Sequence, residues 1–355
     1  MVQHTYNVIG LMSGTSLDGL DIAYCHFIKK ETSWEYKIKA AQTIHYPPVL
    51  KKKLVAATSM SGLDLTMLDA ELGRYFGNQV KKFVRDYVLK KPDFIASHGH
   101  TIFHQPHRGF TLQIASGAYI AAQSKTPVVC DFRTLDVAMQ GQGAPLVPIG
   151  DELLFNQFEY CLNLGGFANV SYRKKKKRIA FDICPVNIVL NELASRLGKT
   201  FDRNGLLAKR GKVNEELLNQ LNELNFYRQK APKSLGKEWV DKYVFPLLNQ
   251  SELKETDLLA TFVEHIAYQI AKSLKAKAKE NILVTGGGAY NSYLIDRIKF
   301  YSKAQIIIPE NKLVEFKEAL IFAFLGLLRW AGKTNTLKTV TGAQKDTCSG
   351  AIYLP

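Results

Sequence analysis

Small, hydroxyl and carboxylate side chains are concentrated in one stretch near the start of the chain. The stretch runs, in order, through Gly14, Thr15, Ser16, Leu17, Asp18, Gly19, Leu20 and Asp21. A turn of this composition exposes backbone N–H groups and hydroxyls, which suits a phosphate that approaches closely. Asp18 and Asp21 would repel bare phosphate, but their oxygens can hold Mg²⁺, usually through water. The lysine and the glycine spacing of a Walker loop are absent, so an ordinary Gly/Ser hairpin is the alternative.

Two further glycine turns follow strand-like segments. Gly165 and Gly166 come after residues 159–164, and Thr285-Gly-Gly-Gly-Ala-Tyr290, with Gly286, Gly287 and Gly288, comes after residues 281–284. Glycines between a strand and a helix N-terminus are typical of phosphate, dinucleotide and adenosine sites alike. By themselves they specify no ligand.

A lone carboxylate lies in Phe181-Asp-Ile-Cys-Pro-Val-Asn187, at the end of a predicted strand and before a predicted helix. This is a usual place for a catalytic carboxylate. It is equally a usual place for an aspartate that caps a helix. Asp182 is therefore a candidate general base with a structural alternative.

Arg133 lies between two aspartates in Asp131-Phe-Arg-Thr-Leu-Asp136. In a cleft its guanidinium can hold a substrate carboxylate in a bidentate fork, and the alternative is a satisfied ion-pair cluster. Three histidines in residues 98–104 suggest a metal site, but no acidic or cysteine partner is near them in sequence. Loop histidines with ordinary hydrogen bonds are the favoured interpretation.

The strands and helices that must position these residues occur in the same order in two parts of the chain. Residues 8–11 and 20–26 are predicted strands around the first turn, residues 34–46 are a third strand, and residues 63–90 have helical spacing. Residues 159–164, 168–172 and 178–183 repeat the strand pattern around the second glycine turn, with a basic tip at residues 174–177, and residues 188–197 are a helix. This order predicts an α/β structural repeat without sequence repetition.

The remaining segments alternate between strand and helix patterns. Strand signals are predicted at residues 93–97, 111–114, 127–130, 281–284 and 340–354, and helices at residues 117–123, 213–224, 258–277 and 315–329. Residues 201–211 and 231–238 are predicted loops. Three strands in succession followed by helices argue for α/β structure and against a helical bundle.

Length and composition limit the class of protein. A chain of 355 residues predicts two domains, and 46% apolar with 22% charged residues is typical of a soluble globular enzyme. No run of eighteen apolar residues and no charged-then-apolar leader is present, so neither a membrane location nor export is expected. The five scattered cysteines, without a C-x-x-C pair, indicate free thiols and a cytoplasmic location.

The net charge of +15 points to an anionic partner only weakly, because much of it lies in local lysine and arginine runs. A charge run is usually a solvated face, and no interleaving of aromatic and basic residues suggests base stacking. Non-specific attraction to polyanions explains the charge, so we expect no nucleic-acid partner.

Motifs along nearly the whole chain resemble the anhydro-N-acetylmuramic acid kinase family, of the acetate and sugar kinase/Hsp70/actin superfamily. The match extends from about residue 7 to residue 352. The motifs, in family order, are Gly10-Leu-Met-Ser-Gly-Thr-Ser-Leu-Asp-Gly-Leu-Asp21, Ser97-His-Gly-His-Thr101, Thr111-Leu-Gln-Ile114, Asp131-Phe-Arg133, Gly141-Gln-Gly-Ala-Pro-Leu146, Asn163-Leu-Gly-Gly166, Phe181-Asp182 with Pro185 and Asn187, Pro232-Lys-Ser234 with Gly236, Gly286-Gly-Gly288, and Glu318-Ala319 with Phe322-Ala323.

The resemblance implies a fold and a domain organisation. The expected fold is two related RNase H-like α/β domains with mixed five-stranded sheets flanked by helices, in an actin-like ATPase architecture with an interdomain cleft. Domain I is expected to comprise residues 1–131 and about 338–355, and domain II residues 132–337. The C-terminal tail is expected to return to the first domain.

The resemblance also implies an activity. It is the ATP-dependent conversion of 1,6-anhydro-N-acetylmuramic acid to N-acetylmuramic acid 6-phosphate, a step of cell-wall recycling, in a cytoplasmic homodimer. Asp182 matches the catalytic base, residues 14–21 the ATP-phosphate loop, and Gly165, Gly166 and Gly286–Gly288 further nucleotide contacts. Mg²⁺ would bridge the β- and γ-phosphates near Asp18 and Asp21. Asn187 and Glu318 match substrate positions, and Arg133 as partner of the lactyl carboxylate is our inference.

The motif around the base departs from the family pattern. The family usually has Phe-Asp-Thr-Gly-Pro-Gly-Asn, whereas this chain has Ile183, Cys184 and Val186 in place of the threonine and two glycines, and His100 stands where glutamine is common. We interpret this as a variant active site, with Cys184 packed as a small apolar residue. The alternatives are a non-catalytic member that binds nucleotide or muropeptide and regulates, and a nucleotide-gated interaction protein of the Hsp70 or actin type.

Overall fold

The computed structural model describes residues 4–15, 17–175, 177–275 and 279–355. Contacts between residues divide the chain into two compact units, and each is described by itself. Unit 1 comprises Met1–Leu154 and Phe316–Pro355, and unit 2 comprises Phe155–Glu315. The contacts thus group residues 132–154 and 316–337 with unit 1, while the domain limits expected from the family stay a prediction. Within the described ranges, no helix combines the length and the apolar character needed to cross a membrane.

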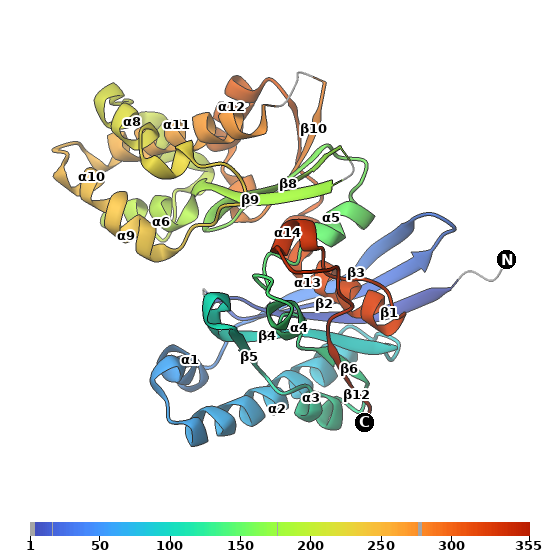
Figure 1. The fold of residues 1–355 in the computed structure, drawn as a ribbon. Helices are drawn as coiled ribbons and strands as arrows, with labels where there is room; N and C mark the ends of the chain where they lie inside the picture. The colour runs from blue at the N-terminus through green and yellow to red at the C-terminus, as the bar shows by residue number, and fades with distance from the viewer. Residues whose placement is uncertain (1–3, 16, 176, 276–278) are drawn as a thin grey trace. The chain divides into compact units, whose positions relative to one another are not determined.

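Unit 1 is built on a seven-stranded mixed sheet in the order β12-β6-β4-β1-β2-β3, with β5 paired to β4 (Figure 1). The first three strands form an antiparallel meander, and β4 and then β6 extend it in parallel from β1. The C-terminal strand β12 pairs antiparallel with β6 and completes the sheet. The strands are β1 Thr5–Ser13, β2 Leu20–Lys29, β3 Trp34–Ile44, β4 Phe94–Gln105, β5 Phe110–Ile114, β6 Val128–Cys130 and β12 Ala351–Tyr353.

Helices cover both faces of this sheet. Alternate residues of β1 point to opposite faces: Ile9 and Leu11 share an apolar core with Phe76 of α2, whereas Gly10 faces α13. A Cβ on Gly10 would lie 1.9 Å from the carbonyl oxygen of Ala319, so only glycine permits this strand–helix distance. The helices are α1 Pro48–Ala56, α2 Gly62–Asp86, α3 Gly117–Ser124, α4 Thr134–Ala138, α5 Pro148–Leu154, α13 Asn311–Trp330 and α14 Lys338–Thr341.

Unit 2 repeats the strand order of unit 1 in a five-stranded sheet, β11-β10-β7-β8-β9 (Figure 1). Strands β7, β8 and β9 form the antiparallel meander, and β10 and β11 continue in parallel from β7. The predicted repeat is therefore present as a shared topology. The strands are β7 Tyr160–Leu164, β8 Phe167–Lys174, β9 Lys177–Pro185, β10 Asn281–Thr285 and β11 Gln305–Ile307.

The core of unit 2 lies between its sheet and helix α11. This helix is apolar on most of its surface, and Phe262 and Ile266 pack with Leu162, Val284 and many other buried residues. The helices are α6 Asn187–Arg196, α7 Leu206–Arg210, α8 Glu215–Asn222, α9 Lys237–Tyr243, α10 Phe245–Gln250, α11 Glu255–Leu274 and α12 Ser292–Ser302.

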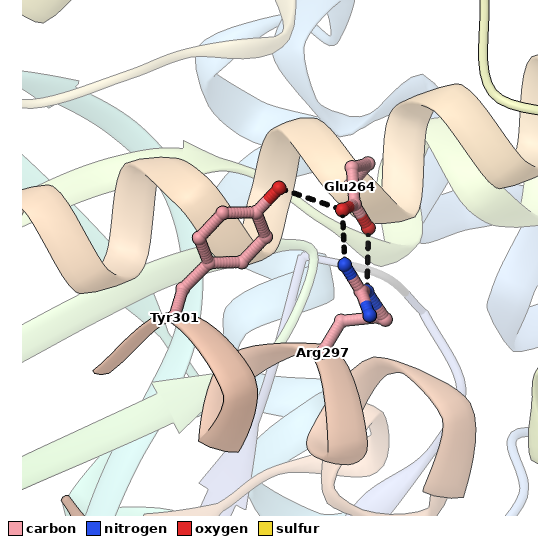
Figure 2. A network of polar contacts seen from close by, with 3 residues as sticks. All are labelled: Glu264, Arg297 and Tyr301. Carbon is pink, nitrogen blue, oxygen red and sulfur yellow. Dashed lines mark hydrogen bonds and ion pairs between the residues drawn. The ribbon is translucent and has the colours of Figure 1, made fainter. Parts of the chain in front are cut away.

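A polar network joins α11 to α12 (Figure 2). Arg297 donates from Nε to Oε2 of Glu264 at 2.7 Å and from Nη2 to Oε1, and Tyr301 donates its hydroxyl to Oε1 at 2.6 Å. The carboxylate, which is almost buried, raises the pKa of Arg297 through this fork. A fully paired fork of this kind fixes the register of two helices.

The structure corrects the sequence-based expectations in several places. The expectation of five strands is right for unit 2 and wrong for unit 1, because β5 and β12 join that sheet. Strand β4 continues to Gln105 because β5 pairs with it, so the histidines expected in a loop lie on a strand. The sequence did not predict helices α1, α4, α5, α7, α9, α10 and α14 or strand β11. Of the predicted strand at residues 340–354, only β12 is present, because α14 occupies the start of this segment. Residue 176 of the basic tip and residues 276–277 of the predicted helix 258–277 lie outside the described ranges.

Candidate active site

The turn between β1 and β2 forms the first part of the candidate site in unit 1. Leu17 has φ of 58° and donates its N–H to the carbonyl of Gly14 at 3.3 Å, while Gly19 has φ of 153°. A Cβ on Gly19 would lie 2.5 Å from the Ile44 carbonyl oxygen, so this position requires glycine. Thr15 is exposed, whereas the side chain of Leu20 is fully buried in the core. The predicted phosphate residue Ser16 lies outside the described ranges.

A buried hydrogen-bond network holds the base of this turn. The Ser13 hydroxyl lies 2.6 Å from the Tyr46 hydroxyl and 2.8 Å from Nδ1 of His100. Burial lowers the pKa of His100 to about 4, so the imidazole is neutral at neutral pH. His100 therefore supports the strand that leads into the turn. Neither Ser13 nor Tyr46 was expected to take part.

Three carboxylates of unit 1 lie at or near the turn. Asp18 is exposed, and its carbonyl oxygen lies 2.7 Å from Nδ1 of His45. Asp21 is partly buried and accepts a hydrogen bond from the Thr43 hydroxyl. Desolvation by the surrounding protein raises the pKa of Glu318 on α13, and the nearby charge of Asp21 adds to that rise. The Glu318 side chain nevertheless has surface exposed to solvent.

Arg133 is held in a fixed orientation at the start of α4. Its Nε donates to Nε2 of His98 at 3.0 Å, and its Nη1 donates to the carbonyl of Gly143 at 2.6 Å. Since Nε2 of His98 accepts this bond, the proton of the neutral ring is assigned to Nδ1, which lies 3.0 Å from the Gly99 carbonyl. Burial and the charge of Arg133 lower the pKa of His98 well below its usual range, consistent with this tautomer.

The two aspartates that flank Arg133 in sequence form hydrogen bonds with residues other than Arg133. Asp136 is buried and accepts from the N–H of Gly143 at 2.7 Å and from the Thr341 hydroxyl at 2.8 Å. Asp131 accepts from the Thr134 hydroxyl. Burial lowers the pKa of Arg133 to about 10, which leaves it cationic. Within the described ranges, Nη2 makes no hydrogen bond, so this corner of the guanidinium is available.

The glycine turns of unit 2 meet at the start of α6. The Gly165 carbonyl accepts from the N–H of Asn187 at 3.3 Å, and the Gly166 carbonyl accepts from Val186 at 2.8 Å. Asn187 also donates from Nδ2 to the Leu164 carbonyl at 3.2 Å. These bonds fix the turn against the N-terminus of α6.

The glycines after β10 lie beside the same turn. Gly286 has φ of 83°, and a Cβ there would lie 2.6 Å from Oδ1 of Asn163. A Cβ on Gly288 would lie 2.7 Å from that of Leu164. Gly287 is exposed, and a Cβ there would have only Nδ2 of Asn187 within 4 Å. Its backbone is open to a ligand.

Asp182 lies near the end of β9, in the same unit. It donates its N–H to the Lys233 carbonyl at 3.0 Å and accepts the N–H of Leu235 on Oδ2 at 2.8 Å. Burial raises the pKa of Asp182, while the Leu235 N–H and the charge of Lys233 oppose that rise. A partly desolvated carboxylate whose proton affinity is raised is suited to general-base chemistry.

The three residues that depart from the family motif point into the core. Ile183, Cys184 and Val186 are all fully buried and belong to the apolar cluster around α11. Cys184 is packed as expected, and burial raises the pKa of its thiol far above the usual range. None of the three side chains projects from the surface on which Asp182 and the glycine turns lie.

The predicted residues thus form two groups. Unit 1 contains the described residues of the first turn with Asp21, Arg133 and Glu318. In unit 2 the glycine turns lie together with Asn187, and Asp182 lies on β9 against Lys233 and Leu235. Sequence reasoning did not identify Lys233 and Leu235 as neighbours of Asp182, or His98 as the partner of Arg133. The motif Pro232-Lys-Ser234, to which no role was assigned, was the signal that could have pointed to Lys233 and Leu235.

Comparisons with known proteins cover the whole candidate site. The profile of the anhydro-N-acetylmuramic acid kinase family matches residues 6–355. A relative from Crocosphaera subtropica is 34% identical, over 98% of both chains, and one from Francisella tularensis subsp. novicida is 35% identical, over 97% of both; each is named anhydro-N-acetylmuramic acid kinase. A solved activator of 2-hydroxyisocaproyl-CoA dehydratase from Clostridium difficile, with bound ADPNP, matches with a TM-score of 0.44 at 13% identity, over 89% of this chain and 92% of that one. The chain belongs to the anhydro-N-acetylmuramic acid kinase family.

Proposed function

We propose that this protein is an ATP-dependent sugar kinase that converts 1,6-anhydro-N-acetylmuramic acid to N-acetylmuramic acid 6-phosphate. It is a phosphotransferase with an alcohol acceptor, and the reaction recycles a cell-wall amino sugar. The observation that carries the proposal is the family match over residues 6–355, which includes both groups of candidate residues. The partly buried Asp182 supplies the carboxylate that the chemistry needs.

Asp182 acts as the general base. It takes a proton from water as the water oxygen bonds to the anomeric carbon and the bond from that carbon to O6 breaks. The freed O6 attacks the γ-phosphorus of ATP, and ADP leaves. The proton on Asp182 then passes to solvent, so that one water and one ATP are used for each sugar phosphate formed.

The remaining residues bind and orient the two substrates. The turn of residues 14–19 binds the ATP phosphates through its backbone N–H groups and the hydroxyls of Thr15 and Ser16. The nucleotide also contacts Gly165, Gly166 and Gly286–Gly288. Asn187 and Glu318 contact the sugar. Arg133 meets the lactyl carboxylate with its Nη2 group, which its fixed orientation leaves available.

Mg²⁺ is the cofactor of this proposal, and the residues of the turn fit it. Asp18 and Asp21 offer the hard oxygen ligands that Mg²⁺ prefers. Among the described residues, no group of three His, Cys, Asp or Glu side chains could hold a metal ion, so the protein alone supplies an incomplete ligand set. When bound, the ion would neutralise charge on the β- and γ-phosphates, with water and phosphate completing its shell.

We also propose that the protein is a cytoplasmic homodimer. Free cysteines at all five positions agree with a reducing compartment. The family suggests the dimer. Sedimentation velocity at micromolar concentration distinguishes a dimer from a monomer.

The non-catalytic alternative is not favoured. Its basis is the altered segment around Asp182, but Ile183, Cys184 and Val186 are buried in the apolar core of unit 2. The decisive experiment incubates the protein with Mg·ATP and 1,6-anhydro-N-acetylmuramic acid and follows the sugar by mass spectrometry. We expect a product heavier by one water and one phosphoryl group. Nucleotide binding without this product would support the regulatory role.

A further inference from the structure

The loop of residues 231–236 lies along the exposed edge of the unit 2 sheet. Strand β9 is the last strand of that sheet, and this loop takes the place of a further neighbour beside Asp182. The Asp182 N–H donates to the Lys233 carbonyl, and the Leu235 N–H donates to Oδ2 of Asp182. Within the described ranges, Oδ1 makes no hydrogen bond. The two carboxylate oxygens are therefore not equivalent.

Lys233 is held near the carboxylate without bonding to it. Its ammonium donates to the Phe226 carbonyl at 3.1 Å and lies 4.3 Å from the centre of the Phe226 ring and 6.0 Å from that of Tyr227. These contacts restrain a side chain that would otherwise be free to form a direct ion pair with Asp182. Burial lowers the pKa of Lys233, which means that the fold accepts an electrostatic cost to place a cation here.

The charged and titratable groups around this pair are few. The positive charge of Lys233 lowers the pKa of Asp182 and of Cys184, and Lys272 of α11 lowers that of Lys233. Burial raises the pKa of the Tyr227 phenol well above its usual range, and that of Cys184 likewise, so both are neutral at neutral pH. Lys233 is thus the charged group that affects Asp182 most.

We propose that the loop of residues 231–236 differentiates the two oxygens of the base: the Leu235 N–H occupies Oδ2, Oδ1 takes the proton from water, and Lys233 is a positioning residue that keeps the carboxylate ionised. This inference rests on the proposed function. A direct Lys–Asp ion pair would favour the anion but make it a weaker base, and would occupy Oδ1. A cation held at a distance favours ionisation and leaves Oδ1 free.

The first test compares pH profiles of kcat/KM. In Lys233→Met the pKa of Asp182 rises because the nearby positive charge is gone, so the acid limb moves to higher pH, by on the order of half a unit to one unit. Lys233→Arg, which keeps the charge, restores the wild-type limb. Lys242→Met is the matched control, since Lys242 lies 5.1 Å from the Tyr243 ring on the exposed part of α9. An unmoved acid limb in Lys233→Met would overturn the inference.

The second test removes the hydrogen bond to Oδ2. Leu235→Pro lacks the N–H, whereas Leu235→Ala keeps it. We expect kcat at the pH optimum to fall about tenfold or more in Leu235→Pro, with the KM for ATP unchanged, and to fall little in Leu235→Ala. Equal kcat in the two variants would overturn the role of Leu235. This comparison decides that role even if Lys233→Met fails to fold.

Asp182→Asn separates this inference from the function on which it rests. If Asp182→Asn is inactive and Lys233→Met leaves the acid limb unmoved, the base assignment stands and the role of Lys233 is wrong. If Asp182→Asn stays active, the base assignment itself fails. The two failures are therefore distinguishable.

Discussion

The turns at the two hairpins, β1–β2 in unit 1 and β7–β8 in unit 2, occupy the same place in one topology but differ in what they leave available. In unit 1 the described part of the turn comprises residues 14, 15 and 17–19 and exposes Thr15 and Asp18, and the hydrogen bond between Ser13 and His100 supports its base. In unit 2 the turn is Gly165 and Gly166, and its carbonyls are used by the N–H groups that begin α6. We propose that the longer turn presents the exposed Thr15 and Asp18 to a ligand, whereas the carbonyls of the shorter turn anchor a helix.

The third strands of the two meanders, β3 in unit 1 and β9 in unit 2, also differ, and here it is unit 2 that carries the candidate reactive group. Asp182 lies on β9, three residues before Pro185, which pairs with the first residue of β8. The comparable part of β3, residues 40–43, contains no carboxylate. We therefore propose that one topology, used twice, serves phosphate contact in unit 1 and proton transfer in unit 2.

The largest effect that tests this division is expected for Asp182→Asn. The amide keeps the shape and the hydrogen bond to Leu235 but cannot accept a proton from water, so kcat should fall on the order of a hundredfold to ten-thousandfold. ATP affinity, measured by calorimetry, should change little, because in our proposal the turn of unit 1 holds the phosphates. Asp296→Asn, at an exposed position on α12, is the control. Near-wild-type turnover, or parallel loss of ATP binding, would make Asp182 a metal or structural carboxylate.

The next effect concerns the longer turn. Gly19→Ala places a Cβ against the Ile44 carbonyl at a φ that alanine rarely adopts, a strain of about 1–3 kcal/mol, and the KM for ATP should rise roughly tenfold or more. Gly166→Ala has open space around its Cβ and should raise that KM much less. Gly62→Ala, at an equally open position in α2, is the control for unit 1. Equal effects at Gly19 and Gly166 would contradict the distinction between the two turns.

A smaller effect, on stability, is expected in unit 2. Arg297→Met leaves the almost buried Glu264 without its cation, and the free energy of unfolding should fall by about 2–3 kcal/mol. Lys237→Met removes an exposed pair with Asp241 and should change it by less than about 0.5 kcal/mol. Hydrogen exchange should accelerate in α11 and α12 and stay unchanged in α2. Faster exchange in both units would show that they do not unfold separately.

The smallest effect concerns Asp182 and pH. Because burial raises its pKa above the unfolded value, folding favours the protonated acid. That stabilisation is present below the unfolded pKa and is lost as pH rises through the folded pKa. Asp182→Asn, which never ionises, should therefore have a higher melting temperature than wild type at neutral pH. The gain should vanish below about pH 3.9, the ordinary aspartate value. A lower melting temperature at neutral pH would indicate that the carboxylate is stabilising.

Much of the fold could be predicted because the patterns that encode it are local. Alternation in residues 20–26 and helical spacing in residues 63–90 identified β2 and α2, and the repeated order predicted the shared topology. Strand β11 and the extension of β4 could not be predicted, because both depend on pairing with segments distant in sequence. Helix α1 begins at Pro48, directly after Pro47, and has little amphipathic character, so no helical signal is visible there in the sequence.

The candidate site shows the same limit. Asp182 and the glycines were identified by motif, but the partners that determine their behaviour lie far along the chain. Leu235 reaches Asp182 from fifty-three positions away, and Gly143 and His98 together fix Arg133. Residue type and spacing reveal which groups can react. The hydrogen bonds that set their orientation and pKa depend on tertiary contacts.

Unit 1 consists of two separate segments of the chain, and this affects the order in which the two units can fold during translation. Unit 2 is one uninterrupted segment, so its sheet and helix α11 can form while later residues are still being synthesised. Unit 1 depends on α13, which packs against Gly10, and on β12, which pairs with β6. The sheet formed by its first 154 residues stays incomplete, with the face around Gly10 uncovered, until α13 and β12 have left the ribosome. During translation unit 2 can therefore fold completely before unit 1 does.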